Sequence, residues 1–494
     1  MSLPQAECPL RLAVPMTEHT DRQHHQMTLG ILAIGALAFA LAQTTVIPAL
    51  TSMQHAFGVS TSGITWMVSA YFLAASVATP VLGRLGDMFG KGRFLAISLA
   101  AFAVGSVICA LSNGLEMMIV GRVLQGVGGG VFPLSFGIVR DEFPRPRIPT
   151  GIALLGATAG IGGAIGLPLG GVLVDQASYH WIFWLSAAMG AAATITTIRF
   201  VPESPVRTPG RIDVAGAAIL AAGLSAVLIA ISRANEWGWT SARTLGLLAA
   251  GLLALAAFVA FERRHAEPLI NMRTLARPPV LITDIATLLV GFGLFGTFVL
   301  IPQIAELPKG GDVGLGLDAT VAGLLMAPGG LMMLLVAPIV GRVGERVGSK
   351  PPLVVGALLA AAGLVGMALA HGSAIDIILW GALLNTGVGC AFAALPNLIV
   401  SAVEPHETGE ATGVNTIARN IGASLGGQVA ASIVASHVVA GGLPADRGFE
   451  LAFLVSAGVA VLAGACGALI PVPARGEVDG VGVSDSGLAG SRSG

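Results

Sequence analysis

The sequence "GRLGDMFGKGR", Gly83 to Arg93, concentrates charge and glycine in a very short interval. Four of its eleven residues are charged and four are glycines, although only 11% of the whole chain is charged. Long apolar runs lie on both sides of it. A similar stretch, "GRVGERVGSK" (Gly341 to Lys350), begins 258 residues later. Glycines permit a tight turn between two helices, so the recurrence predicts the same helix–turn–helix corner in two copies.

The composition is that of a protein that crosses a membrane many times. The chain has 494 residues, of which 54% are hydrophobic, and its mean hydropathy is +0.83. Apolar runs of about 20 residues, long enough to cross a bilayer, recur throughout. The net charge of −1 and the lack of a basic cluster argue against a nucleic-acid partner. Four scattered cysteines show no metal-ligand spacing, so no metal site is expected.

The pattern predicts an all-α, polytopic membrane protein with fourteen spanning helices. An even number of spans places both termini on the same side of the membrane. The expected spans are 28–50, 62–83, 93–112, 115–139, 148–174, 178–200, 213–232, 243–262, 279–303, 319–340, 351–371, 375–401, 409–437 and 448–471.

The distribution of positive charge predicts which side that is. Cytoplasmic segments of membrane proteins are enriched in Lys and Arg. If the N-terminus is cytoplasmic, 20 of the 26 Lys and Arg residues fall in cytoplasmic segments, whereas the opposite orientation would place these 20 outside. We therefore expect both termini in the cytoplasm. The exceptions are Arg233, Arg243, Lys309 and Arg447 on the outer side, and Arg122 and Arg419 within spans.

Further pairs of motifs support a duplication. "GVGGG" at Gly126 is similar to "GVGCA" at Gly387, and the "TG" at Thr150 has a counterpart at Thr412, at intervals of 261 and 262 residues. Two six-helix halves with a substrate site between them are a transporter plan. The expected organisation is a cytoplasmic tail (1–27), an N-terminal six-helix bundle (28–200), a linker with two inserted helices (201–278), a C-terminal six-helix bundle (279–471) and a flexible cytoplasmic tail (472–494).

These motifs resemble those of the major facilitator superfamily. Gly83–Arg93 is similar to its signature loop between helices 2 and 3, and "GRVLQGVGGG" (Gly121–Gly130) to its fourth-helix motif. "GATAGIGGAIGLPLGG" (Gly156–Gly171) resembles the fifth-helix motif of antiporters. Together with fourteen spans, this implies membership of the 14-helix drug:proton antiporter family.

The resemblance implies a secondary active transporter in the cell membrane that works by alternating access. It would export amphiphilic organic molecules or drugs in exchange for protons. The expected partners are a small organic substrate, protons and the lipid bilayer. We expect a monomer without a cofactor, and not an enzyme, since the short loops carry no catalytic constellation.

The two charged turns are candidates for a conformational latch between the halves. The resemblance places Asp87 against the start of the thirteenth helix, and pseudosymmetry then places Glu345 at the start of the fifth. A carboxylate is stabilised at a helix N-terminus, so such contacts would hold the cytoplasmic side shut. A plain solvated loop explains the basic residues singly, but not the acid in both copies. The candidate latch residues are Gly83, Asp87, Gly90, Arg93, Gly341 and Glu345.

The fifth helix is predicted to pack closely against a neighbour. Gly162, Gly166 and Gly170 are four residues apart and lie on one face, which allows close helix contact. Pro168 should kink this helix. The family pattern has Gly and Pro adjacent, whereas here Leu167 stands between Gly166 and Pro168.

Polar side chains within spans are candidates for coupling or substrate binding, because they are costly in a membrane. Arg122 lies inside the fourth span with Gln125 one turn on, and Arg419 lies inside the thirteenth. The family pattern has an acid in helix 1, but here Gln43 is found instead. Asp284, about 8 Å into the ninth span, is the remaining carboxylate candidate for the proton.

Two other functions fit parts of the sequence. Two mid-span arginines are consistent with an organic-anion carrier. A membrane sensor that has kept the fold without transport is the alternative of another class, although no large extramembrane domain supports it.

Overall fold

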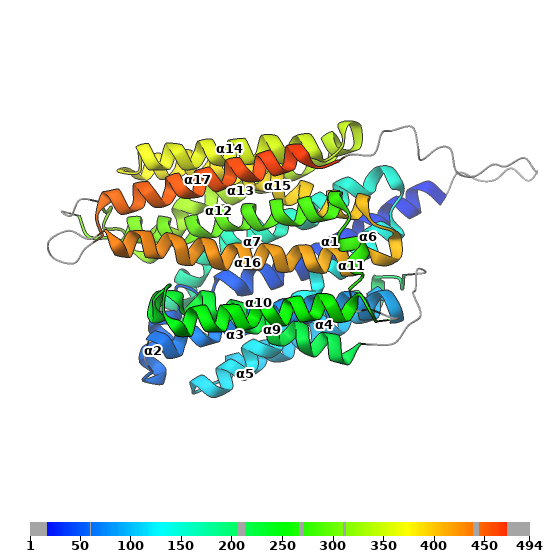
Figure 1. The fold of residues 1–494 in the computed structure, drawn as a ribbon, viewed down its shortest axis with the longest axis horizontal. Coiled ribbons are helices and arrows are strands. Elements are labelled where there is room, and N and C mark those ends of the chain that lie inside the picture. The colour runs from blue at the N-terminus through cyan, green and yellow to red at the C-terminus, as the bar shows by residue number, and fades with distance from the viewer. Residues whose placement is uncertain are drawn as a thin grey trace, which may run out of the picture.

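The computed structural model describes residues 17–59, 61–204, 213–265, 268, 270–309, 313–437 and 444–471. Within these ranges the chain is helical, and its long helices run side by side along one axis (Figure 1). Residues 1–16 of the expected N-terminal tail and the whole expected tail 472–494 lie outside the described residues. Residues 17–27 are part of the first helix, Thr17–Thr44.

The first part of the chain forms the N-terminal half, which we define as α1 to α8. One predicted span, the fourth, is built from two α-helices joined by a 3-10 turn. The elements are α1 (Thr17–Thr44), α2 (Leu50–Phe57), α3 (Thr61–Phe89), α4 (Lys91–Ala110), α5 (Leu115–Gly126), η1 (Val127–Gly130), α6 (Val131–Glu142), η2 (Arg145–Arg147), α7 (Ile148–Gln176) and α8 (His180–Phe200).

The rest of the chain forms an inserted hairpin, α9 and α10, and a C-terminal half, α12 to α17. The elements are α9 (Val214–Trp237), α10 (Ala242–Glu262), α11 (Met272–Leu275), α12 (Pro278–Glu306), α13 (Ala319–Val347), α14 (Lys350–Leu369), α15 (Ala374–Ala402), η3 (Pro405–Glu407), α16 (Thr408–Ser436) and α17 (Asp446–Leu469).

This architecture confirms the predicted fold class. Each of the fourteen expected spans corresponds to one long helix or, for the fourth, to the α5–η1–α6 stack. Eleven helical segments of the described residues are long and apolar enough to cross a membrane, and α12 contains a shorter apolar segment, Pro278–Leu294. The helices α3 and α16 are not among the eleven. Both carry buried polar side chains, such as Ser76 and Asn420, which face the opposite half rather than lipid.

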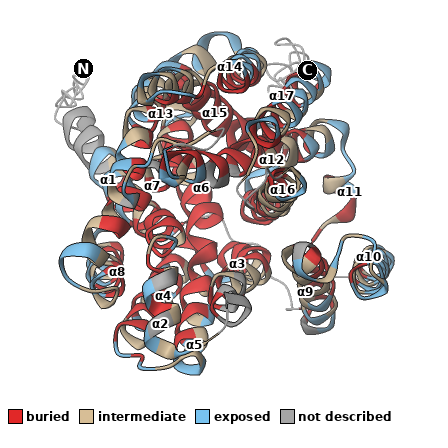
Figure 2. Cartoon of the chain, turned by 90° about the vertical axis from the view of Figure 1, so that its left-hand side faces the viewer, coloured by how far each residue is buried: buried red, intermediate tan, exposed pale blue. Residues whose placement is uncertain are grey.

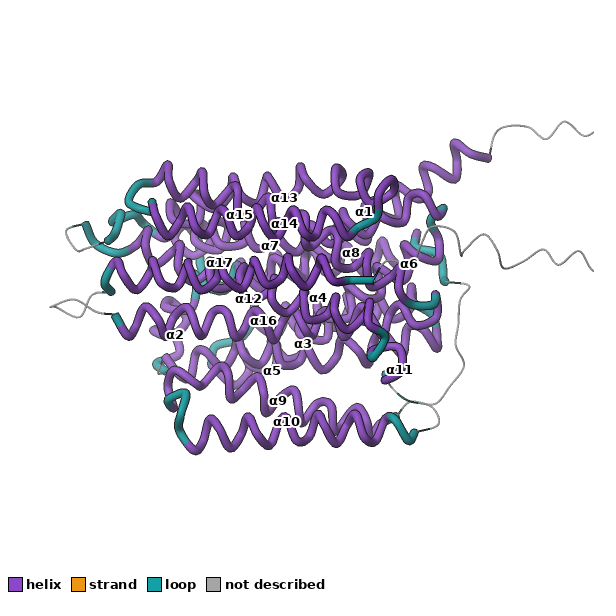
Figure 3. Tube along the Cα trace, turned by 45° about the horizontal axis from the view of Figure 1, so that its top comes forward, coloured by secondary structure: helices purple, strands orange, loops and turns teal. Residues whose placement is uncertain are grey.

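Both described termini lie at one end of the molecule. The start of α1 and the end of α17 are on the right in Figure 1, where α6 and α11 also lie. The turns at Gly83–Arg93 and Gly341–Lys350 are at this same end, which we call the motif end. The other end, which carries α2, is called the opposite end (Figure 3).

Each half has its own hydrophobic core. The N-terminal core is built around Phe39, Tyr71, Phe102 and Phe132, all nearly inaccessible to solvent, whereas the C-terminal core is formed mainly by α12 to α17. The halves contact each other along two seams, α7 with α13 and α3 with α16. The inserted hairpin lies at the rim beside α3, and α9 contacts both α3 and α16 (Figure 2). The insert therefore covers one seam and leaves both six-helix halves intact.

The glycine repeat of α7 packs against α1. A Cβ at Gly162 would lie 2.4 Å from the Ala40 Cβ, and a Cβ at Gly170 would lie 2.2 Å from the Thr45 carbonyl oxygen. The Thr44 hydroxyl donates to the Gly162 carbonyl oxygen over 2.8 Å. These contacts bring the two backbones together in the way that small residues permit in membranes.

We expect Gly170→Leu to lower the stability of the folded protein by about 3 kcal/mol, because the new side chain would overlap the backbone of Thr45, the residue that directly follows α1. Gly246→Leu on α10 is the matched control, since nothing lies within 4 Å of its Cβ position. The measurement is the melting temperature of each purified variant in detergent. Equal melting temperatures would contradict the close packing of α1 and α7.

Candidate functional site

At the first turn of the motif end, a glycine and a carboxylate of α3 lie in close contact with α16 of the other half. A Cβ at Gly83 would lie 2.6 Å from the Gly409 carbonyl oxygen, and a Cβ at Gly409 would lie 2.8 Å from Asp87 Oδ2. Asp87 is almost fully buried, with 1% of its surface exposed. Its carboxylate therefore lies against the first turn of α16, where the positive end of the helix dipole stabilises an anion.

A buried lysine completes this corner. Lys91 Nζ lies 3.3 Å from Asp87 Oδ1 and 2.6 Å from Asp141 Oδ2, and it has no exposed surface. Ser204 Oγ also donates to Asp141 Oδ2. The ammonium group thus joins α3 to α6 within the N-terminal half. In the sequence Lys91 was interpreted only as one of the cytoplasmic positive charges.

Gly90 and Arg93 have different places in this turn. Gly90 separates α3 from α4 with φ of 118°, which favours glycine. The side chain of Arg93 is exposed, and its backbone N–H donates over 3.2 Å to Glu203 Oε2. The Gly92 N–H donates to the other oxygen of Glu203 over 3.0 Å. Glu203, which the sequence did not single out, therefore caps the N-terminus of α4.

The second turn makes the pseudosymmetric contact with α7. A Cβ at Gly341 would lie 2.7 Å from the Thr150 Cα, and the Thr150 hydroxyl donates over 2.6 Å to Glu345 Oε1. Gly348, 258 residues after Gly90, also has a positive φ, of 87°. Ser349 stands where the first turn has Lys91. The buried cluster of Asp87, Lys91 and Asp141 therefore has no counterpart in the second copy.

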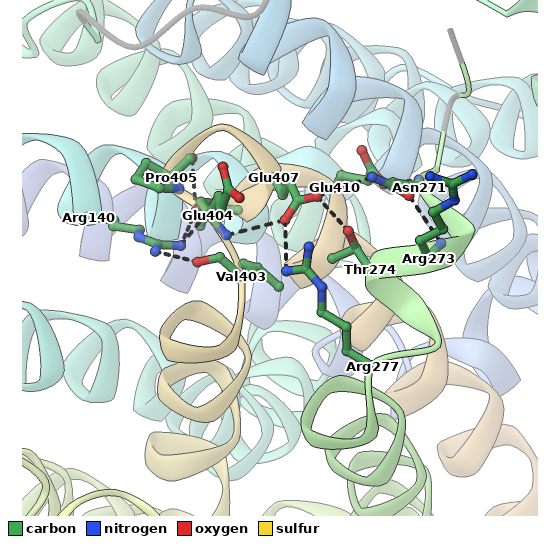
Figure 4. A network of polar contacts seen from close by, with 11 residues as sticks. Arg140, Asn271, Arg273, Thr274, Arg277, Val403, Glu404, Pro405, Glu407 and Glu410 are labelled. Atoms are coloured by element: carbon green, nitrogen blue, oxygen red, sulfur yellow. Dashed lines mark hydrogen bonds and ion pairs between the residues drawn. The ribbon is translucent and has the colours of Figure 1, made fainter. Parts of the chain in front are cut away.

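Arg140 makes a third contact across the halves at the motif end (Figure 4). From the end of α6 its guanidinium donates to the Val403 carbonyl oxygen over 2.6 Å and to the Glu404 carbonyl oxygen over 3.3 Å. It also donates to Thr408 Oγ1 over 2.6 Å. The cation binds the two carbonyl groups that directly follow α15, and its charge complements the dipole at the C-terminus of that helix.

The same figure shows how the segment after the inserted hairpin is tied to the start of α16. Glu407 accepts from Asn271 Nδ2 over 3.2 Å and from Thr274 Oγ1, and it forms an ion pair with Arg277 at 3.4 Å. The backbone N–H of Asn271 donates to Glu410. The sequence showed Arg277 only as a topology signal, because these pairings join residues more than a hundred positions apart.

A second glycine face of α7 meets the C-terminal half. A Cβ at Gly156 would lie 2.3 Å from the Phe392 carbonyl oxygen on α15, and a Cβ at Gly160 would overlap the Met333 side chain on α13. Gly323 of α13 packs in the same way against Pro168, which lies within the continuous helix α7. One face of α7 thus packs within its own half and another forms the seam.

Arg122 is held inside the N-terminal half. Its guanidinium donates to the carbonyl oxygens of Ala42 (3.2 Å) and Met67 (3.3 Å) and to Gln125 Oε1 (2.9 Å). Its charge also lies 4.2 Å from the centre of the Tyr71 ring. Arg122 has no exposed surface, so it links α1, α3 and α5 to one another.

Gln43 and Asp284 lie in separate clusters. Gln43 lies beside Tyr71 in the N-terminal half, and the Tyr71 hydroxyl donates to the Phe39 carbonyl oxygen over 3.1 Å. Asp284 of α12 is buried and accepts from Asn415 Nδ2 of α16 over 2.9 Å. The same Asn415 nitrogen donates to Thr287 Oγ1 over 2.7 Å. The structure therefore does not bring Asp284 and Arg122 into one cluster.

Arg419 lies between the halves. Its guanidinium carbon is 5.3 Å from the centre of the Phe132 ring on α6 and 5.5 Å from that of Phe392 on α15. Asn420, the next residue, donates to Ser76 Oγ of α3 over 3.4 Å. Of the candidates within spans, Arg419 is the one whose side chain contacts both halves.

Comparison with known proteins places this architecture in a family. The sequence profile of the Major Facilitator Superfamily matches residues 32–427. The "Tetracenomycin C resistance and export protein" of Streptomyces glaucescens is 31% identical over 415 residues, covering 83% of this chain and 76% of that protein. "Multidrug resistance protein 3" of Bacillus subtilis is 27% identical over 409 residues, covering 81% and 77%.

A solved structure has the same fold. The human organic anion transporter MFSD10 (TETRAN) superposes with a TM-score of 0.65 at 17% identity, covering 90% of this chain and 99% of that one. At this identity the likeness concerns the fold alone. The profile match, the relatives and the two six-helix halves agree, and the chain belongs to the Major Facilitator Superfamily.

Proposed function

We propose that this chain is a secondary transporter of the cell membrane that exports amphiphilic organic molecules in exchange for protons by alternating access. The observation that supports this function most strongly is the concentration of close contacts between the halves at the motif end. Asp87 with α16, Glu345 with Thr150, and Arg140 with the end of α15 all lie there. The names of the bacterial relatives support export of drug-like molecules as the direction and cargo.

In this proposal the motif end is cytoplasmic and the contacts form a latch. The latch residues are Gly83, Asp87, Gly90, Gly341 and Glu345, with Arg93 acting through its backbone. Such contacts stabilise the closed form by a few kcal/mol at most, so they can break once per cycle. In the closed form Arg140 adds a cation that binds the carbonyl groups directly after α15.

The proton is assigned to Asp284. It lies seven residues into α12, farther from a helix end than any other carboxylate on the long helices that the structure describes. Asn415 and Arg419 are one turn apart on α16, so a change in the charge of Asp284 reaches the region between the halves through Asn415. Arg122 and Gln125 serve to hold the N-terminal half in shape.

Flux measurements in inverted membrane vesicles test the proposed function. Cationic, neutral and anionic amphiphiles are offered as a panel while an inside-acid pH gradient is imposed. We expect accumulation of at least one compound, and its loss when a protonophore collapses the gradient. Vesicles without the protein are the control. If no compound accumulates above that control, the proposed export is wrong.

Topology follows from the distribution of positive charge. We expect Arg145Cys, which lies at the motif end, to react with an impermeant thiol reagent only in inverted vesicles. Arg243Cys at the opposite end should react only in intact cells. Both positions are exposed, and both variants are made in a chain without its natural cysteines. Labelling of Arg145Cys from outside intact cells would reverse the orientation.

A further inference from the structure

Arg419 is a cation in the middle of the transporter. It lies eleven residues after Thr408, the first residue of α16, which places it about 17 Å along a 29-residue helix. The backbone carbonyl of Arg419 packs against Gly291 of α12, in its own half. Its side chain extends the other way, to the region between the halves, and keeps part of its surface accessible.

The contacts of its guanidinium are aromatic. Phe132 from the N-terminal half and Phe392 from the C-terminal half lie 5.3 and 5.5 Å from the guanidinium carbon. Among the described residues, no carboxylate forms an ion pair with Arg419. This contrasts with Lys91, which has two carboxylate partners, and with Arg122, which donates to backbone carbonyls and Gln125.

An unpaired guanidinium at this depth is costly unless water or a ligand occupies its donors. Ring contacts attract the charge by roughly 0.5–2 kcal/mol each but use none of its five N–H donors. Those donors have the flat, forked arrangement that binds a carboxylate with two hydrogen bonds. The site thus supplies what an organic acid requires, a donor fork with apolar walls beside it.

We propose that Arg419, Phe132 and Phe392 bind the anionic group of an aromatic substrate, so that the transported molecules include aromatic carboxylates. The inference rests on the proposed function and specifies its substrate class. The rings come from α6 and α15, one in each half, and Arg140 at the end of the same α6 binds the end of the same α15. A ligand on Arg419 would therefore touch both halves where their separation changes.

Equilibrium binding tests this site without a membrane gradient. The probes are 2-naphthoate and its neutral amide, 2-naphthamide, which have the same ring system and differ in charge. Their dissociation constants are measured by isothermal titration calorimetry on the full chain in nanodiscs. We expect the wild-type protein to bind 2-naphthoate at least 10-fold more tightly than the amide.

Substitutions test which residues cause the preference for 2-naphthoate over 2-naphthamide. Arg419→Gln should reduce the preference for 2-naphthoate to less than about 2-fold while affinity for the amide is kept. Arg419→Lys retains the charge without the fork and should give an intermediate preference, and this variant serves if the glutamine variant fails to fold. Phe132→Leu should weaken the binding of both probes. Arg243→Gln, at the outer surface, is the control and should leave both constants unchanged.

Equal binding of the two probes by the wild-type chain would overturn this inference, as would an intact preference in the Arg419→Gln variant. Neither result touches the proposed export, which the vesicle experiment tests separately. Conversely, a chain that prefers 2-naphthoate through Arg419 but moves no compound in vesicles would keep the site and refute the proposed function.

Discussion

Asp87→Asn is expected to reduce transport at least 10-fold while the protein still folds. The substitution keeps the shape of the side chain and removes the negative charge beside the first turn of α16. A charge at a partly buried helix terminus contributes up to about 2 kcal/mol, which corresponds to roughly a 30-fold change in the ratio of closed to open forms. Lys91 retains Asp141 as a partner, so the corner itself should persist.

The measurement is initial flux of the best compound of the panel, normalised to folded protein. Glu345→Gln should have a weaker effect, because Glu345 is exposed and its interaction with Thr150 is screened by water. Glu116→Gln, an exposed carboxylate at the opposite end, is the control and should transport normally. Wild-type flux in well-expressed Asp87→Asn protein would show that this turn is not a latch and that its charges only reflect the orientation of the chain in the membrane.

Asp284→Asn is expected to abolish flux driven by a pH gradient while leaving substrate binding largely intact. Asparagine keeps the size of the side chain and its place beside Asn415, but it cannot take up and release a proton at physiological pH. We expect the pH-driven flux to fall by 100-fold or more, and the binding constant to change by less than about 3-fold. Asp318→Asn, on an exposed residue, is the control.

Arg122→Ala separates this account from one in which Arg122 binds an anion. Its removal would leave the Ala42 and Met67 carbonyl groups without these donors, so we expect lost folded protein and impaired binding together. Full proton-coupled flux in Asp284→Asn protein would refute the assignment of the proton to Asp284. Selective loss of binding in a stable Arg122→Ala protein would move the substrate site to the N-terminal half.

Much of the fold could be predicted because its signals are local or periodic. Apolar runs mark the spans, and glycines at equal intervals mark the duplicated corners, since Gly90 and Gly348 both have positive φ. The bounds of the first helix were predicted less accurately. The helix α1 begins at Thr17 rather than at 28 and ends at Thr44, because the following turn and α2 take up residues that the apolar run had merged with it.

The pairings between distant segments were not predictable in the same way. Lys91, Arg140 and Glu203 each look like an ordinary charge near a membrane surface, and their partners lie 50, 263 and 111 residues away. Only the folded chain brings these partners together, within one half for Lys91 and Glu203 and across the halves for Arg140. The mid-span arginines show the same limit, since both carry the same sequence signal, yet Arg122 is enclosed in one half and Arg419 lies between two.

In the proposed mechanism the closed motif end opens in every transport cycle. A chain without its natural cysteines that carries Thr150Cys and Glu345Cys allows a direct test, because these side chains meet across the halves. Bridging them with a short bifunctional thiol reagent should stop flux in vesicles, and a reducible reagent should restore it on reduction. Ser373Cys with Asp376Cys, a pair within one half, should transport normally when bridged. Undiminished flux with the motif end bridged would show that this end does not open during transport.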